Sequence, residues 1–163
     1  MNNKYEKELS IIIPLFNEAP CLQELFSEVS SAVIPLNIKY EIIFVDDGSL
    51  DNSFSVLKEI HEKYPSIVKI IQFRKNYGKS AALSEGFKLA LGKIIITMDA
   101  DLQDDPKEIP NFLNTINEGY DLTLVGPGRA DVGLIEGFLT WTFLKGTKYT
   151  RKDYLGRDSV VDI

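Results

Sequence analysis

Short runs of apolar residues alternate with longer amphipathic stretches along most of this chain. The apolar runs cover residues 9–15, 40–45, 68–73, 93–98 and 121–125, and they are rich in isoleucine and valine. Apolar runs of this length with many β-branched residues favour strands that are covered on both faces, as in a parallel sheet.

The stretches between these runs place apolar residues three and four positions apart, which is the spacing of an amphipathic helix. The predicted helices cover residues 22–33, 54–61, 80–91 and 106–118. Pro20 has the residue type expected at the first position of a helix, Asp51 fits an N-cap, and Gly92 fits the glycine that ends a helix. These signals support a regular alternation of strands and helices.

That alternation predicts an α/β fold, a three-layer, doubly wound and mostly parallel sheet with helices on both faces. It stops near Gly126, so we expect an α/β core over residues 1–126 and an irregular segment over 127–163. The apolar patch at 134–144 is too short to span a bilayer. It fits either a helix that packs on the sheet, which is the favoured interpretation, or a surface in a membrane interface.

The composition excludes several classes of protein. The 163 residues carry 18 Lys and Arg against 24 Asp and Glu, a net charge of −6, which argues against nucleic-acid binding because that needs a basic face. The single cysteine, Cys21, cannot form an internal disulfide. No apolar stretch reaches the roughly 18 residues of a membrane-spanning helix, and the polar N-terminus does not resemble a secretory signal. We therefore expect a cytoplasmic protein.

Acidic residues follow the second and fourth apolar runs, where an open parallel sheet binds its ligands. Asp99 and Asp101 stand directly after the fourth run, and their mutual repulsion suggests a hard divalent cation, Mg²⁺ or Mn²⁺. Such an ion would let an acidic cleft accept an anionic diphosphate. For Asp104 and Asp105, capping of the helix that starts at Pro106 is the favoured interpretation.

The segment at 76–80 precedes an alanine-rich helix but lacks the glycine spacing of a phosphate-binding loop. Two interpretations remain open: Lys79 at a helix N-terminus attracts an anion, or Gly78 only supplies the backbone freedom of a tight turn. His61 is the only histidine, so neither a His-containing triad nor a multi-histidine metal site is supported.

Taken in order, the strand-end motifs resemble those of the family 2 glycosyltransferases. The matching segments are IPLFNE at 13–18, EIIFVDDGSLD at 41–51, NYGKSAA at 76–82 and MDADLQDDP at 98–106. They span about residues 9–126. The DADLQD form is most similar to the branch that moves a sugar onto a polyprenyl phosphate, such as dolichyl-phosphate mannose synthases and undecaprenyl-phosphate sugar transferases.

This resemblance implies a GT-A fold that binds a nucleotide-diphosphate sugar, with UDP preferred over GDP, and Mg²⁺ or Mn²⁺. The nucleotide-sugar residues it implies are Pro14, Phe16, Glu18, Val45, Asp47, Asp99 and Ala100. Asp101 and Gln103 would hold the metal, and Asp99 and Asp101 would be the catalytic residues. The reaction would be an inverting transfer to a polyprenyl phosphate or a glycan, with peripheral contact at the inner face of a membrane.

The resemblance implies that residues 1–126 form the nucleotide-sugar-binding core and that residues 127–163 form a partial acceptor side of the same domain. This C-terminal part departs from the family pattern. Members that use hydroxyl acceptors often carry a Gln-x-x-Arg-Trp motif, whereas Trp141 here follows Leu139-Thr140. A catalytically silent nucleotide-sugar-binding module or fragment is therefore the alternative. A phosphoacceptor signalling domain is disfavoured, because its acid pair would follow the first strand and Asp46-Asp47 follows the second.

Overall fold

The computed structural model describes residues 6–117, 122–125, 140–144, 148–152 and 158–162. Eight strands are present in that part: β1 (Lys7–Leu15), β2 (Tyr40–Asp46), β3 (Val68–Gln72), β4 (Gly92–Thr97), β5 (Leu122–Val125), β6 (Thr140–Leu144), β7 (Lys148–Lys152) and β8 (Asp158–Asp162). Six of them form one sheet in the order β3-β2-β1-β4-β6-β5, and β7 pairs with β8 separately. β1 is parallel to both β2 and β4, β2 is parallel to β3, and β6 is antiparallel to β4 and β5. The predicted mostly parallel sheet is confirmed.

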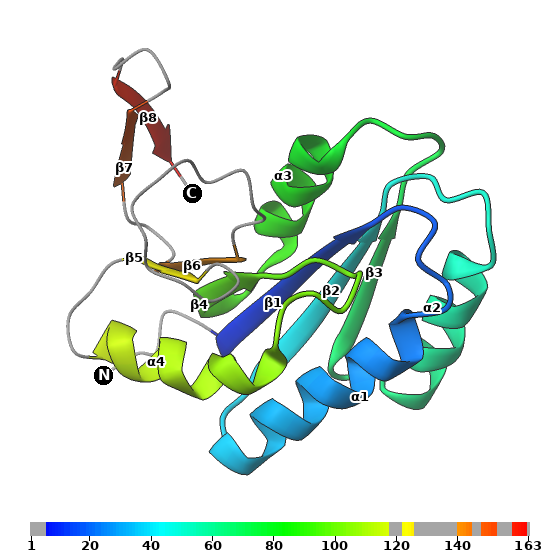
Figure 1. Ribbon diagram of the computed structural model, residues 1–163, viewed down its shortest axis with the longest axis horizontal. Coiled ribbons are helices and arrows are strands. Elements are labelled where there is room, and N and C mark those ends of the chain that lie inside the picture. Colours follow the sequence, from blue (N-terminus) through cyan, green and yellow to red (C-terminus); the bar gives the residue numbers. More distant parts are fainter. Residues whose placement is uncertain (1–5, 118–121, 126–139, 145–147, 153–157, 163) are drawn as a thin grey trace.

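Helices cover both faces of this sheet. They are α1 (Leu22–Val33), α2 (Ser53–Lys63), α3 (Lys79–Leu89) and α4 (Ile109–Asn117), with 3-10 turns at Ile34–Leu36 and Pro106–Glu108. α3 packs on one face, while α1, α2 and α4 lie on the other (Figure 1). The three-layer, doubly wound architecture expected from the sequence is therefore present.

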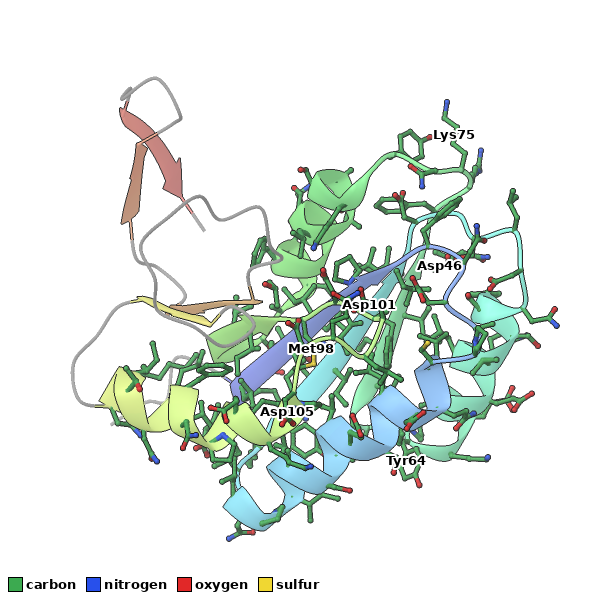
Figure 2. All side chains as sticks on the ribbon, viewed as in Figure 1. Asp46, Tyr64, Lys75, Met98, Asp101 and Asp105 are labelled. Atoms are coloured by element: carbon green, nitrogen blue, oxygen red, sulfur yellow. The ribbon has the colours of Figure 1, made fainter. Side chains whose placement is uncertain are left out.

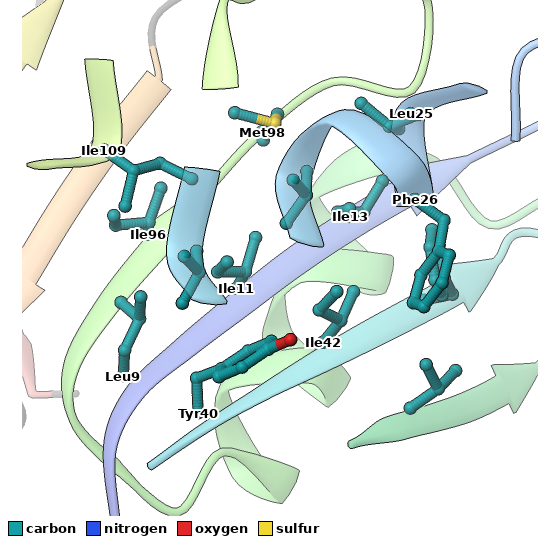
Figure 3. Packing of buried hydrophobic residues seen from close by; sticks show 14 of the residues in the cluster. Leu9, Ile11, Ile13, Leu25, Phe26, Tyr40, Ile42, Ile96, Met98 and Ile109 are labelled. Atoms are coloured by element: carbon teal, nitrogen blue, oxygen red, sulfur yellow. The ribbon is translucent and has the colours of Figure 1, made fainter. Parts of the chain in front are cut away.

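The central strand β1 is apolar at consecutive positions because both of its faces are covered. Leu9, Ile11 and Ile13 belong to the larger apolar cluster beneath α1, α2 and α4, part of which Figure 3 shows. Ile12 points the other way, into the smaller cluster beneath α3. All four side chains are fully buried, and each such burial stabilises the fold by about 1.5–3 kcal/mol. β1 thereby fixes the position of the loop that follows it.

Two of the predicted helix ends are wrong. Pro20 lies in the turn before α1 and not at the first helical position. Gly92 does not end α3, which stops at Leu89; it is the first residue of β4. A Cβ atom at Gly92 would lie 2.5 Å from the Ser10 backbone nitrogen, so the glycine allows β4 to approach β1 closely.

The predicted N-cap at Asp51 is wrong by one residue, because Asn52 occupies that position. Asn52 directly precedes α2, but its side chain makes no capping hydrogen bond. Instead, Asp51 Oδ1 accepts a hydrogen bond from the Ser53 backbone N–H at 2.9 Å. This bond satisfies one of the N–H groups that have no partner within the helix.

The C-terminal apolar patch differs from its prediction. Residues 134–139 lie outside the described residues, and residues 140–144 form strand β6, so the expected packing helix is wrong there. Ile95 of β4 is the register partner of Phe143, which places β6 in the main sheet. A dense apolar run of this length fits a helix or a strand equally well until its pairing partners are known. Among the described residues, no helix has the length and apolar character needed to cross a bilayer.

Candidate active site

A cleft of about 310 Å³ opens at the carboxyl ends of β1, β2 and β4. The strand ends, the loops that follow them and the first turn of α3 supply its lining: Pro14, Leu15, Phe16, Glu18, Asp47, Asn76, Gly78, Lys79, Ala82, Asp99, Ala100 and Asp101. Figure 2 shows Asp101 among the side chains near this end of the sheet. Parallel strands direct their carboxyl ends to one edge, which is why residues from distant motifs meet here.

The structure brings together all but two of the residues predicted for the site. Val45 is fully buried and packs with Ile12 and Ala82 beneath α3, so its side chain does not reach the cleft. Gln103 is exposed and is not part of the lining; its backbone N–H donates to Asp101 Oδ1 at 3.1 Å. Val45 misses the cleft because it lies inside β2, where α3 covers its side chain.

The lining includes residues from the β3–α3 loop that the predicted site did not contain. Gly78 has a φ of 93°, which glycine adopts without steric cost, so the tight-turn interpretation holds. Lys79, the first residue of α3, reaches across the cleft to Asp99. The NYGKS segment marks this loop in the sequence. The residues that bind it, Asp47 and Asp99, follow β2 and β4, which are distant in the sequence.

Asp47 organises the β3–α3 loop. Its two carboxylate oxygens accept hydrogen bonds from the backbone N–H groups of Tyr77 (2.7 Å) and Gly78 (2.8 Å). Asp47 is also almost completely buried, at 3% exposure. The carboxylate therefore fixes the turn that leads into α3 while it contributes to the cleft lining.

Lys79 and Asp99 form an ion pair inside the cleft. The Lys79 Nζ atom lies 2.6 Å from Asp99 Oδ1 and 2.8 Å from Asp99 Oδ2. The loop that carries Asp99 is fixed in turn, because the Asp99 backbone N–H donates to Asp104 Oδ2 at 3.0 Å. Asp105 accepts from the Lys107 backbone N–H and caps the 3-10 turn, so the capping predicted for it is confirmed.

The rest of the cleft carries uncompensated negative charge. Burial raises the pKa of the Glu18 carboxyl, and the negative charges of Asp101, Asp51 and Asp99 raise it further. A carboxylate whose neighbours are also anionic binds a cation more readily, because the cation relieves the repulsion.

The donor atoms present fit a divalent cation that arrives with its ligand. The described part of the chain contains no group of three or more His, Cys, Asp or Glu side chains placed to hold a metal by themselves. Asp99 and Asp101 nevertheless offer carboxylate oxygens to the cleft. Mg²⁺ commonly binds through one or two protein carboxylates and completes its coordination with water and phosphate oxygens.

Known proteins with similar sequences are sugar transferases. The undecaprenyl-phosphate 4-deoxy-4-formamido-L-arabinose transferase of Serratia proteamaculans (strain 568) is 42% identical over 125 residues, which cover 77% of this chain and 38% of that protein. The enzyme of the same name from Klebsiella pneumoniae (strain 342) is 41% identical over 116 residues, covering 71% of this chain and 36% of that protein. The chain thus spans little more than a third of the length of these curated relatives.

Solved structures with a similar fold include two with bound nucleotides. The mannosyltransferase PcManGT from Pyrobaculum calidifontis, in complex with GDP-Man and Mn²⁺, has a TM-score of 0.53 and 28% identity, and covers 60% of this chain and 28% of that chain. S. aureus TarS in complex with UDP has a TM-score of 0.65 and 20% identity, and covers 84% of this chain and 46% of that chain. These likenesses confirm the predicted GT-A type of sheet.

The family match covers nearly the whole sequence, from residue 10 to residue 162. The similarity to undecaprenyl-phosphate transferases agrees with the polyprenyl-phosphate branch that the DADLQD motif indicated. This chain therefore belongs to glycosyl transferase family 2.

Proposed function

We propose that this chain is the donor-binding part of a metal-dependent, inverting glycosyltransferase. It would move a sugar from a nucleotide diphosphate to a polyprenyl phosphate, with a glycan as the alternative acceptor. The cleft carries this proposal, because it joins Phe16 and Asp47 on one side to Asp99 and Asp101 on the other. The similarity to undecaprenyl-phosphate transferases supports the choice of acceptor.

The nucleoside would bind on the side of the cleft formed by the ends of β1 and β2. Pro14 and Phe16 offer apolar and aromatic surface there, and Phe16 is 40% exposed, so its ring is available for a base. Asp47 already accepts two backbone N–H groups, but an ionised carboxylate has about four acceptor positions and can take a further hydrogen bond. We expect UDP to be preferred over GDP, and the experiment below compares both.

The diphosphate would lie toward Asp101, where the negative charge is concentrated. Asp101 and Gln103 would hold the metal ion, with Gln103 turning its exposed side chain toward the ligand. A bound Mg²⁺ or Mn²⁺ ion supplies a Lewis acid that neutralises the charge developing on the departing diphosphate. Lys79 places a second positive charge in the same cleft, and its ion pair orients Asp99 toward the ribose and the sugar.

The transfer itself needs little proton chemistry when the acceptor is a phosphate. An ionised phosphate oxygen attacks the anomeric carbon from the side opposite the diphosphate. The new carbon–oxygen bond forms as the bond to the diphosphate breaks, and the electron pair of that bond leaves with the diphosphate. A general base is required only for a hydroxyl acceptor.

The experiment is a transfer assay on the purified chain. UDP- and GDP-sugars are offered with undecaprenyl phosphate, with and without Mn²⁺, and the glycolipid product is measured. We expect metal-dependent transfer in the wild type and none in Asp101→Ala, while Asp105→Ala, whose carboxylate caps a turn outside the cleft lining, remains active. Nucleotide binding without any transfer would instead support the silent module, and absence of both contradicts the proposal.

A further inference from the structure

The loop after β1 is held by side chains of the loop after β2. Three consecutive backbone N–H groups of the first loop donate to three different side chains, two in the second loop and one at the first residue of α2. The pairs are Asn17 N to Ser49 Oγ (2.9 Å), Glu18 N to Ser53 Oγ (3.0 Å) and Ala19 N to Asp51 Oδ2 (3.2 Å). Three backbone donors of the loop after β1 are therefore satisfied from outside its own segment.

The connection also runs in the opposite direction. Asn17 Oδ1 accepts a hydrogen bond from the Leu50 backbone N–H at 2.8 Å, so Asn17 is both donor and acceptor to the second loop. Asn17 has a φ of 60°, a left-handed conformation that asparagine tolerates better than most residues. Its neighbours on either side, Phe16 and Glu18, both line the cleft.

The acceptor side chains are themselves held in place. Asp46, which is fully buried, accepts the Ser49 backbone N–H at 2.9 Å. Asp51 Oδ1 accepts both the backbone N–H and the hydroxyl of Ser53, at 2.9 and 2.5 Å. The hydroxyl of Ser53 thus donates to Asp51 while its oxygen accepts from the first loop. Side chains that make two hydrogen bonds at once, such as Ser53 and Asp51, have a fixed orientation without a ligand.

The same β2–α2 loop also fixes the opposite side of the cleft. Asp47 accepts from Tyr77 and Gly78, as described above. Gly48 has a φ of 74°, and a Cβ atom there would lie 2.4 Å from the Lys75 carbonyl carbon. The backbones of the two loops are therefore in direct contact at Gly48. The β2–α2 loop therefore holds both the loop after β1 and the β3–α3 loop.

Most of the hydrogen bonds between the two segments lie at the surface. The bonds of Asn17 to Ser49 and Leu50 are exposed, and so is the bond from Ala19 to Asp51. Exposed hydrogen bonds add little to global stability because water competes for the same groups. Their clearer effect is local: they restrict the backbone that presents Phe16 and Glu18 to the cleft.

We propose that Asn17, Ser49, Asp51 and Ser53 form a positioning clamp that preorganises the nucleoside side of the donor site. None of the four lines the cleft, so each acts through Phe16 and Glu18. The inference rests on the proposed function, because it assigns the clamp to the same nucleotide. Holding the loop in its bound geometry in advance removes the ordering cost that binding would otherwise carry.

Two pairs of variants separate the clamp from general destabilisation. Asn17→Gly keeps the left-handed backbone accessible and deletes the acceptor, whereas Asn17→Asp retains an acceptor oxygen. Ser49→Ala deletes the acceptor of the Asn17 N–H, whereas Ser49→Thr retains a hydroxyl. Ser66→Ala is the matched control, because Ser66 is an exposed serine that precedes β3 at the other end of the sheet.

The probes are UDP, GDP and Mg²⁺–pyrophosphate, titrated by calorimetry into the purified chain. We expect Asn17→Gly and Ser49→Ala each to lower the affinity for whichever of UDP and GDP binds more tightly by about fivefold to tenfold. That change corresponds to the loss of one hydrogen bond that restrains the loop. Mg²⁺–pyrophosphate, which lacks the nucleoside, keeps its affinity. Asn17→Asp, Ser49→Thr and Ser66→Ala stay within about twofold of the wild type. If Asn17→Gly does not fold, the Ser49 pair decides.

Unchanged nucleotide affinity in the deleting variants overturns the clamp and leaves the proposed function standing. An equal loss for nucleotide and pyrophosphate also overturns it, because that pattern indicates a general disturbance of the cleft. If the wild type binds pyrophosphate but neither nucleotide, the proposed function fails and the clamp loses its role with it.

Discussion

Two glutamates, one near each end of the central sheet, have opposite surroundings. Near the amino-terminal ends of the strands, the buried Glu41 accepts from the Ser10 hydroxyl (2.5 Å) and the Leu91 N–H (2.6 Å), and it pairs with Lys69 (2.7 Å). At the carboxyl ends, Glu18 instead faces the negative charges of several aspartates. Glu41 is therefore neutralised by partners within the fold, whereas Glu18 lies among other negative charges.

The pKa values of the two glutamates follow this contrast. Burial alone raises the pKa of Glu41, but the hydrogen bonds from Lys69, Ser10 and Leu91 outweigh it and hold the pKa below its usual value. Burial and like charges raise the pKa of Glu18. The same sheet thus holds one carboxylate with its partners inside the fold, on β2, and presents another among like charges, in the loop after the neighbouring β1.

The largest expected effect is on stability at the amino end. Glu41→Ala leaves Lys69, whose side chain is 32% exposed, without its partner. It also leaves the Ser10 hydroxyl and the Leu91 N–H without their acceptor, and each buried donor left unpaired costs about 1–3 kcal/mol. Urea unfolding measures the loss. Glu41→Gln keeps an acceptor oxygen and should cost clearly less. An unfolding free energy of Glu41→Ala within error of the wild type would contradict the claim that Glu41 stabilises the fold.

The pH dependence of this stabilisation has a definite sign. Because the pKa of Glu41 is lower in the folded state, its contribution is complete above the ordinary glutamate pKa of about 4.3 and is lost as pH falls through the lowered value. Unfolding midpoints measured from pH 7 to pH 3 should therefore converge for the wild type and Glu41→Gln at the acidic end. Curves that stay parallel contradict the assignment.

At the carboxyl end, the largest effect is on activity. Asp101→Ala removes a carboxylate from the cleft and should reduce metal-dependent transfer by about 10²–10³-fold, the range seen when one transition-state electrostatic contact is lost. Its stability should not fall, because the variant also removes a charge that repels Glu18. Transfer rates and unfolding midpoints, measured on the same preparations, test both parts.

The Lys79–Asp99 ion pair gives a smaller effect with a matched control on the same helix. Lys79→Ala removes the positive charge opposite Asp99 and should weaken nucleotide-diphosphate binding by about tenfold. Lys88→Ala breaks an exposed pair with Glu85, which the cleft lining does not include, and should leave binding unchanged. Calorimetry distinguishes the two, and equal effects would show that net charge alone is responsible.

The parts of the fold and of the site that the sequence predicts are those that depend only on residues close together in the chain. The strands and the acidic motifs after β2 and β4 were predictable, because short β-branched runs and their flanking residues are read within a few positions. Three features depend on which distant segments meet: β6, the close approach of Gly92 to Ser10, and the pairing of Lys79 with Asp99. The assignment of Val45 to the nucleotide site stays a prediction, and its packing beneath α3 could not be predicted from the motif alone because it depends on a distant segment.

The smallest expected effect concerns Glu18. Since its pKa is raised in the folded state, its contribution to stability falls as pH rises above about 4.3 and stays unfavourable at neutral pH. Glu18→Gln should therefore raise the unfolding free energy at pH 7 by about 0.5 kcal/mol or less, and the gain should vanish near pH 4. Thermal unfolding at the two pH values checks the sign. A loss of stability at pH 7 would contradict it.

The central claim is that a divalent cation near Asp101 lets this acidic cleft hold a nucleoside diphosphate. The most direct measurement is the ratio of nucleotide affinity in Mn²⁺ to that in EDTA, taken by calorimetry for the wild type and for Asp101→Ala. We predict a ratio well above one for the wild type that collapses toward one in the variant. The same ratio in both proteins, or no nucleotide binding by the wild type under either condition, would contradict the claim.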